Sequence, residues 1–205
     1  MTGTEALQRL RALGTPLITT ADVTAALGVN AGTASKIASR LAADGLIVHL
    51  ARGRWALLDK VNPFTLPEHL TAPYPAYVSL QSALYHYGMI SQIPHVVYAV
   101  TLAKPRRWLT PLGVVSLHQV GPDFFFGYGP DGPGGAQIAT PEKALVDVLY
   151  LSPARSRLFS RLPEVEVPRT FSKRAVTEII ARIVDPRRRK LVETGWNRLE
   201  KSSRR

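Results

Sequence analysis

The stretch from Thr19 to Leu58 constrains the fold more than any other part of this 205-residue chain. Thr20 has a hydroxyl group that suits the N-cap of a helix, and Gly28 can adopt the positive φ that ends one. We therefore expect a short helix over residues 21–27, followed by a tight turn.

A second helix is predicted over residues 31–43, with Asn30 as its N-cap. Its apolar residues recur at helical spacing and form a single stripe, which consists of Ala34, Ile37, Ala38 and Leu41. If this stripe packs on the preceding helices, the opposite face carries small polar residues and two cations. The second helix therefore presents a polar, basic surface.

Short strand-like runs over residues 46–48 and 55–58 follow the turn signal Asp44-Gly45. The basic segment Ala51-Arg52-Gly53-Arg54 lies between the two runs. Two short helices followed by a hairpin with a basic tip are typical of a winged helix-turn-helix module. Such a module places its second helix in the major groove of DNA.

The residues predicted to contact DNA combine hydrogen-bonding groups with positive charge. Small polar side chains let a helix approach a groove closely and bond to phosphates and base edges. They are Thr33, Ser35, Lys36, Ser39 and Arg40 on the helix, and Arg52 and Arg54 on the hairpin. The alternative is a solvated polar face beside an ordinary basic hairpin, or a winged fold used for protein contact.

A helix over residues 5–13 completes the N-terminal domain, which we place at residues 1–60. Residues 61–75 contain four prolines and are expected to form an extended linker that is poor in regular structure. Residues 76–205 are then the second domain.

The second domain is expected to combine a small sheet with flanking helices and a helical C-terminal part. Enrichment in β-branched and aromatic residues predicts strands over residues 76–78, 95–102, 113–120, 124–128 and 136–138. Helices are predicted over residues 80–89, 141–151, 153–162, 173–184 and 186–201, with Ser79, Thr140 and Ser172 as N-caps. The predicted fold class of the whole chain is α+β.

The chain has a formal charge of +11 and a pI of about 10.3, which favours an anionic partner, nucleic acid first. The absence of cysteine excludes disulfides and cysteine-ligated metals. No signal peptide is recognisable, and no apolar run reaches the roughly 18 residues that span a bilayer. We therefore expect a cytoplasmic protein without membrane contact.

No motif of catalytic or metal-binding residues is recognisable, so we expect no enzymatic activity, no cofactor and no metal. The five histidines are not spaced as metal ligands. A metal-dependent nuclease is the weaker alternative, because Glu142, Lys143 and Asp147 place acids beside a lysine, with Asp123 upstream. The chemistry of a helix start explains the first two of these residues equally well.

Two further basic segments are candidate contacts for an anionic partner. Lys104, Arg106 and Arg107 lie in a predicted loop beside Trp108, whose ring is suited to stacking on a base. Cations are disfavoured at the start of a helix, where Arg187, Arg188, Arg189 and Lys190 are predicted to lie. The alternatives are a solvated connector and a solvated run of surface charges.

Three stretches of the second domain resemble the AbiEi antitoxin family, namely YVSLQSALYHYGMISQIPHVVYAVTLAKPRR, FFFGY and IATPEKALVDVLYL. The most specific motifs are SLQSAL-x-HYG, which precedes strands, and ATPEKAL-x-D, which opens a helix. The resemblance covers nearly the whole chain; it is strongest over residues 77–151 and weakest after Pro153.

The resemblance implies a winged helix-turn-helix domain joined to an antitoxin domain. Members of this family are typically encoded beside a nucleotidyltransferase-like toxin, in toxin–antitoxin and phage-defence systems. The first domain represses the pair's own promoter by binding inverted repeats, and the second counteracts the toxin, in many descriptions without a stable complex.

Carried onto this chain, the resemblance assigns operator binding to the predicted DNA-contacting residues and antitoxicity to the basic groups of the last 55 residues. A transcriptional regulator without a toxin is the chief alternative. We expect a monomer in solution that binds each half of an inverted repeat.

Overall fold

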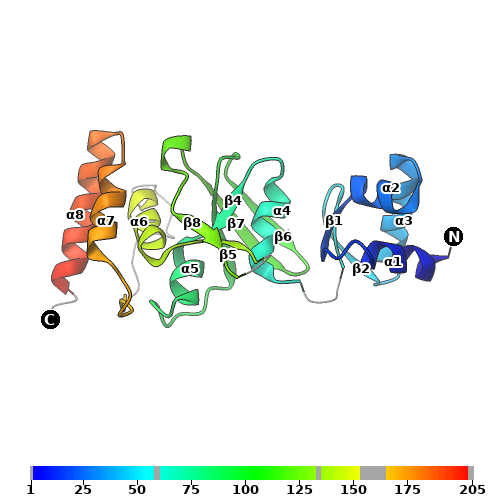
Figure 1. Ribbon diagram of the computed structural model, residues 1–205, viewed down its shortest axis with the longest axis horizontal. Coiled ribbons are helices and arrows are strands. Elements are labelled where there is room, and N and C mark those ends of the chain that lie inside the picture. Colours follow the sequence, from blue (N-terminus) through cyan, green and yellow to red (C-terminus); the bar gives the residue numbers. More distant parts are fainter. Residues whose placement is uncertain (1, 58–60, 133–134, 153–164, 203–205) are drawn as a thin grey trace.

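The computed structural model of the protein describes residues 2–57, 61–132, 135–152 and 165–202. Within these residues the protein has mixed α and β structure with two β-sheets, as the α+β prediction requires. Along the long axis the N-terminal helices lie at one end, the larger sheet in the middle and the C-terminal helices at the other end (Figure 1). In the part of the chain that is described, no helix has the length and apolar character needed to cross a membrane.

The N-terminal unit, residues 2–57, consists of three helices and a three-stranded antiparallel sheet of order β1-β3-β2. Its elements are α1 (Gly3–Arg11), β1 (Leu17–Thr19), α2 (Thr20–Leu27), α3 (Ala31–Ala43), β2 (Ile47–Ala51) and β3 (Arg54–Leu57). Strand β1 was not predicted from the sequence.

The ends of α2 and α3 are determined by local hydrogen bonds. Thr19, rather than the predicted Thr20, is the N-cap of α2, and it forms a reciprocal capping box with Asp22. Gly28 ends α2 at φ +67°, as predicted. Asn30 caps α3 by accepting from the backbone N–H of Thr33 at 2.9 Å, which confirms the predicted start of that helix.

The segment predicted to be an extended linker contains regular structure. It forms a 3-10 turn, η1 (Pro63–Thr65), and a short helix, α4 (Leu66–Thr71). Two of the four prolines, Pro63 and Pro67, lie in the first positions of the two elements, where a missing N–H costs nothing, and the other two follow α4. The prediction that residues 61–75 are extended and poor in regular structure is therefore wrong.

The second unit, residues 61–202, is built around a six-stranded sheet of order β6-β7-β5-β4-β9-β8. The strands are β4 (Ala76–Val78), β5 (Val96–Thr101), β6 (Arg106–Thr110), β7 (Gly113–Gln119), β8 (Tyr128–Pro130) and β9 (Gln137–Ala139). The pairs β5–β7 and β4–β9 are parallel, and the other neighbours are antiparallel.

Two strand predictions differ from the structure. Residues 106–110, predicted to lie in a loop, form the edge strand β6, which pairs with β7. The strand predicted over residues 124–128 is instead a 3-10 turn, η2 (Pro122–Phe124), followed by Gly127 at φ +75° and then β8. The positive φ of this glycine interrupts the extended conformation that the three phenylalanines favour.

Alternation along the strands divides the apolar residues of the sheet between two clusters. One face packs on α5 (Leu80–His86) and α6 (Pro141–Leu151), with α7 (Lys173–Ala181) and α8 (Pro186–Ser202) beyond them. The other face packs on α4 and on the N-terminal hairpin β2–β3. We call this second group the junction cluster: Leu50, Ala51, Ala56, Leu66, Leu70, Ala99, Val115 and Leu117.

The predicted C-terminal helices are confirmed where the structure describes them. Thr140 caps α6, and Ser172 caps α7 by accepting from the N–H of Ala175 at 3.1 Å. The helix predicted over residues 153–162 lies outside the described residues.

Candidate functional site

The outer face of α3 brings together all five residues that were predicted to contact DNA from this helix. Each of them is exposed: Thr33, Ser35, Lys36, Ser39 and Arg40. On the opposite side, Ala34, Ala38 and Leu41 are fully buried in the N-terminal core. The predicted division of the helix into an apolar and a polar face is therefore confirmed.

The exposed face of α3 is chemically suited to a polyanion. Its two cations stand among hydroxyl groups and the small residue Gly32, so a groove wall can come close to the helix backbone. Hydroxyl groups donate and accept hydrogen bonds, and the arginine presents a planar fork of donors.

The tip of the hairpin β2–β3 presents one arginine to solvent and turns the other inward. Arg52 is exposed, and Gly53 beside it has φ +68°. The guanidinium of Arg54 donates from Nε to the carbonyl oxygen of His69 at 2.7 Å and from Nη2 to that of Ala72 at 2.6 Å. Arg54 is thus engaged with the second unit, away from the surface predicted to bind DNA.

Contacts around Arg54 join the two units. His69 is partly buried, and burial together with the positive charge of Arg54 lowers the pKa of its imidazole from 6.5 to about 4, against the opposing effect of Asp22. The junction cluster packs Leu50 and Ala56 of the hairpin against α4 and the sheet. The predicted boundary near residue 60 is therefore bridged by a shared apolar core and by two charge-assisted hydrogen bonds.

The basic residues at the start of β6 are divided between the two faces of the sheet. Arg106 and Trp108 point to the face of the junction cluster, where the guanidinium carbon lies 3.8 Å from the centre of the indole ring. Arg107 lies between them in sequence, so its side chain leaves the opposite face. Lys104, Arg106 and Arg107 are all exposed, but they do not form one patch.

The cluster at the start of α8 is stabilised by its own chain. The carboxylate of Asp185 accepts from the backbone N–H groups of Arg187 and Arg188, which offsets the cations at this helix terminus. The side chain of Arg188 donates to the carbonyl of Tyr150, and that of Arg189 to the carbonyl of Ile183. Arg187 and Lys190, the remaining members, are exposed.

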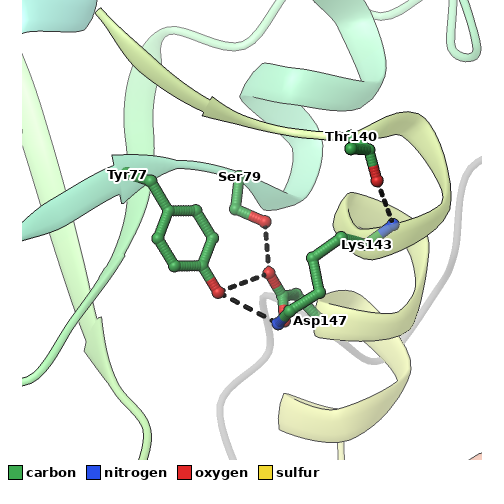
Figure 2. Close-up of polar contacts among 5 residues, drawn as sticks. All are labelled: Tyr77, Ser79, Thr140, Lys143 and Asp147. Carbon is green, nitrogen blue, oxygen red and sulfur yellow. Dashed lines mark hydrogen bonds and ion pairs between the residues drawn. The ribbon is translucent and has the colours of Figure 1, made fainter. Parts of the chain in front are cut away.

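A buried polar cluster was not predicted from the sequence. It joins Tyr77 and Ser79, at the end of β4, to Lys143 and Asp147 of α6 (Figure 2). The ammonium group of Lys143 forms an ion pair with the carboxylate of Asp147 and donates to the hydroxyl of Tyr77 at 3.0 Å. The same carboxylate accepts from Ser79 at 2.7 Å and from Tyr77 at 3.1 Å.

Burial determines the electrostatics of this cluster. The side chains of Lys143 and Asp147 are both fully buried, and the ammonium group lies 3.8 Å from the centre of the Phe124 ring. Burial raises the pKa of the Asp147 carboxyl and lowers that of the Lys143 amine, while their mutual attraction opposes both changes. Burial and the neighbouring carboxylate raise the pKa of Tyr77 well above 10.

Lysine, aspartate and tyrosine can all transfer protons, and here all three side chains are fully buried. Each of their polar atoms has a hydrogen-bond partner within the cluster, and these bonds connect α6 to β4. Ser79 was predicted to be a helix N-cap; it makes no capping bond and donates to Asp147 instead. The cluster therefore joins β4 to α6 inside the core of the second unit.

One signal in the sequence could have revealed this cluster. Helix α6 is apolar on nearly every side, and such a helix is buried all around. Lys143 and Asp147 are spaced i, i+4, so two opposite charges in a wholly buried helix must pair with each other. The interpretation of Lys143 as part of a helix start overlooked this requirement.

The three acids that were considered for a nuclease site have different surroundings in the structure. Asp147 is bound within the buried cluster, and Glu142 accepts from the backbone N–H of Ser172 at 2.8 Å. Asp123 is exposed in η2. In the described residues no three His, Asp or Glu side chains are grouped so that they could hold a metal ion.

The two sequence motifs that carry the family resemblance meet in this cluster. Ser79 opens the first motif, and Lys143 and Asp147 belong to the second. Neither a protein-family model nor a curated protein sequence matches the chain.

Proposed function

We propose that the protein is a sequence-specific DNA-binding regulator whose N-terminal unit acts as a winged helix-turn-helix, with α3 as the helix that enters the major groove. The single observation that carries this proposal is the exposed face of α3, where five hydrogen-bonding or cationic side chains stand opposite the fully buried Ala34, Ala38 and Leu41. A helix in that arrangement can read base edges while its other side remains packed.

The hairpin supports the same proposal. Arg52 is exposed at the turn between β2 and β3, and the carbonyl of Gly53 accepts from the N–H of Thr20 at the start of α2. This bond holds the hairpin tip against the helices of the N-terminal unit. A cation fixed there is suited to a backbone phosphate beside the groove that α3 occupies.

We further propose that the regulator is an antitoxin that represses its own operon and counteracts a nucleotidyltransferase-like toxin. The resemblance of the second unit to the AbiEi family supports this part of the proposal. Its DNA is then an inverted repeat in its own promoter. A gene for such a toxin beside the gene for this chain distinguishes an antitoxin from a regulator without a toxin.

The test is fluorescence anisotropy of the full chain with DNA from its own upstream region and with a scrambled duplex, over a series of salt concentrations. We expect tighter binding to the upstream DNA, weakened by salt. Lys36→Ala and Arg40→Ala should each lower the slope of log K against log salt by about one unit.

Two variants make this test specific. Ser39→Leu adds bulk to the exposed face of α3 and should abolish selective binding while leaving the melting temperature unchanged. Arg198→Ala removes an exposed cation from α8, at the far end of the molecule, and should leave binding as in the wild type (Figure 1). Equal, weak binding to both duplexes by the wild type would refute the proposal.

A further inference from the structure

Arg106 lies against an aromatic ring, and within the described residues its side-chain N–H groups donate to no acceptor. Its guanidinium carbon lies 3.8 Å from the centre of the Trp108 ring, and Trp108 itself packs on the junction cluster. Such stacking orients the planar fork at a small cost in side-chain entropy when a ligand binds. The arginine is therefore preorganised for an anion.

The surroundings of Arg106 are basic. In the described residues neither Arg106 nor Lys104 forms an ion pair with a carboxylate, whereas the exposed Lys173 and Arg174 of α7 pair with Glu200 and Glu178. A groove of about 470 Å³ runs beside them, and no residue that lines it is acidic. Its polar and aromatic lining includes Thr71, Tyr74, Lys104, Arg106, Trp108 and Gln119.

The basic groove lies close to the hairpin β2–β3. Arg106 pairs with Leu117 across the sheet and so lies on the face of the junction cluster, which also contains Leu50 and Ala51 of β2. Strands β2 and β6 are in contact. Ala51 directly precedes Arg52 at the hairpin tip, so the basic groove lies on the same side of the sheet as the hairpin.

The connection between the two units is rigid enough to fix this relationship. The shared junction cluster and the two hydrogen bonds of Arg54 hold the hairpin against the second unit. The position of the basic groove relative to the hairpin is therefore set by contacts within the protein itself.

We propose that Lys104 and Arg106 bind the phosphate backbone of duplex DNA outside the segment that α3 reads, so that the second unit extends the footprint of the protein on its operator. This inference rests on the proposed function of the N-terminal unit. The contacts are electrostatic, and they add affinity and salt dependence without adding sequence preference.

Arg107 provides a matched control for this proposal. It is adjacent in the same strand, exposed and equally charged, but it leaves the other face of the sheet. Arg106→Ala and Lys104→Ala should each reduce the salt slope by about one unit on a long operator duplex, and the double variant by about two. Arg107→Ala should leave the slope unchanged.

The experiment uses the full chain and two duplexes, one confined to the segment that α3 protects and one extended by about one helical turn, about 10 base pairs, on each side. On the short duplex the salt slope of Arg106→Ala should equal that of the wild type. Equal slopes for the Arg106 and Arg107 variants on the long duplex would overturn the inference, as would a loss that persists on the short duplex.

Failure of the proposed function gives a different result. In that case the wild type shows no preference between operator and scrambled DNA, whatever the duplex length. The salt slopes of Arg106→Ala and Arg107→Ala on the long duplex still test the inference. If Arg106 contacts the phosphate backbone of DNA, the two slopes must differ. A difference seen only with single-stranded RNA would also overturn it.

Discussion

The guanidinium of Arg54 donates to the backbone carbonyl of His69, so a residue at the end of the N-terminal hairpin holds a helix of the second unit. The same side chain reaches the carbonyl of Ala72. Arg54 is the first residue of β3, directly after the turn that carries Arg52. The two arginines are close in sequence, but their environments assign them different roles.

Arg54→Ala should lower the free energy of unfolding by about 1–3 kcal/mol, because charge-assisted hydrogen bonds to two carbonyls are lost. Chemical denaturation of the full chain measures this change. Arg52→Ala is the control and should alter stability by less than about 0.5 kcal/mol, since its side chain is exposed. In DNA binding we expect the opposite: Arg52→Ala should reduce the slope of log K against log salt, and Arg54→Ala should leave it unchanged. A slope reduced equally by both variants would contradict this assignment.

Asp147→Asn should destabilise the protein by about 3–5 kcal/mol, because it leaves the buried ammonium group of Lys143 without a counter-charge. The double variant Lys143→Met/Asp147→Asn removes both charges and should recover at least half of that loss. A double-mutant cycle measured by denaturation gives the coupling energy. Strictly additive effects would show that the two side chains do not form a pair in solution.

Stability should fall as the pH drops from about 6.5 towards 4, in part through His69. The pKa of this residue is about 4 in the folded protein, below its ordinary value of 6.5, so the unfolded chain takes up the proton first. At pH 7 and above this effect is absent. The melting temperature of the wild type should therefore decrease more between pH 7.5 and 5 than that of His69→Gln. Parallel decreases would indicate that His69 titrates as a solvated histidine.

The cations of α8 should separate into two groups. Arg188→Ala removes a bond to the carbonyl of Tyr150 at the end of α6 and should lower the melting temperature. Arg187→Ala/Lys190→Ala changes exposed groups and should leave both stability and operator binding intact, while it impairs rescue of cells that express the cognate toxin. Full rescue by this double variant would exclude the two cations from antitoxicity.

Local signals predicted the N-terminal helices well. Asn30 and Gly28 mark helix ends through bonds and backbone angles that involve only near neighbours, and the apolar stripe of α3 needs no more than helical spacing. The strands were harder. The sequence around Arg106 contains a proline and consecutive cations, which suggests a loop, but pairing with β7 along its whole length makes it a strand.

Interactions between distant residues account for most of the site that the sequence did not reveal. Arg54 meets its acceptors 15 and 18 residues further along the chain, and Tyr77 meets Asp147 across 70 residues. No spacing rule predicts such contacts. The division of Arg106 from Arg107 is different, because period-2 alternation would have indicated it once the segment was recognised as a strand.

The junction cluster limits how this chain can be rearranged. Excision of the N-terminal unit would uncover Leu50 and Ala56, two apolar side chains that the second unit now shields from water. If the three helices and the hairpin were fused to an unrelated protein, the hairpin would expose this apolar patch, which is a liability for aggregation. The N-terminal unit is therefore not portable, because its hairpin needs the sheet of the second unit to keep these side chains buried.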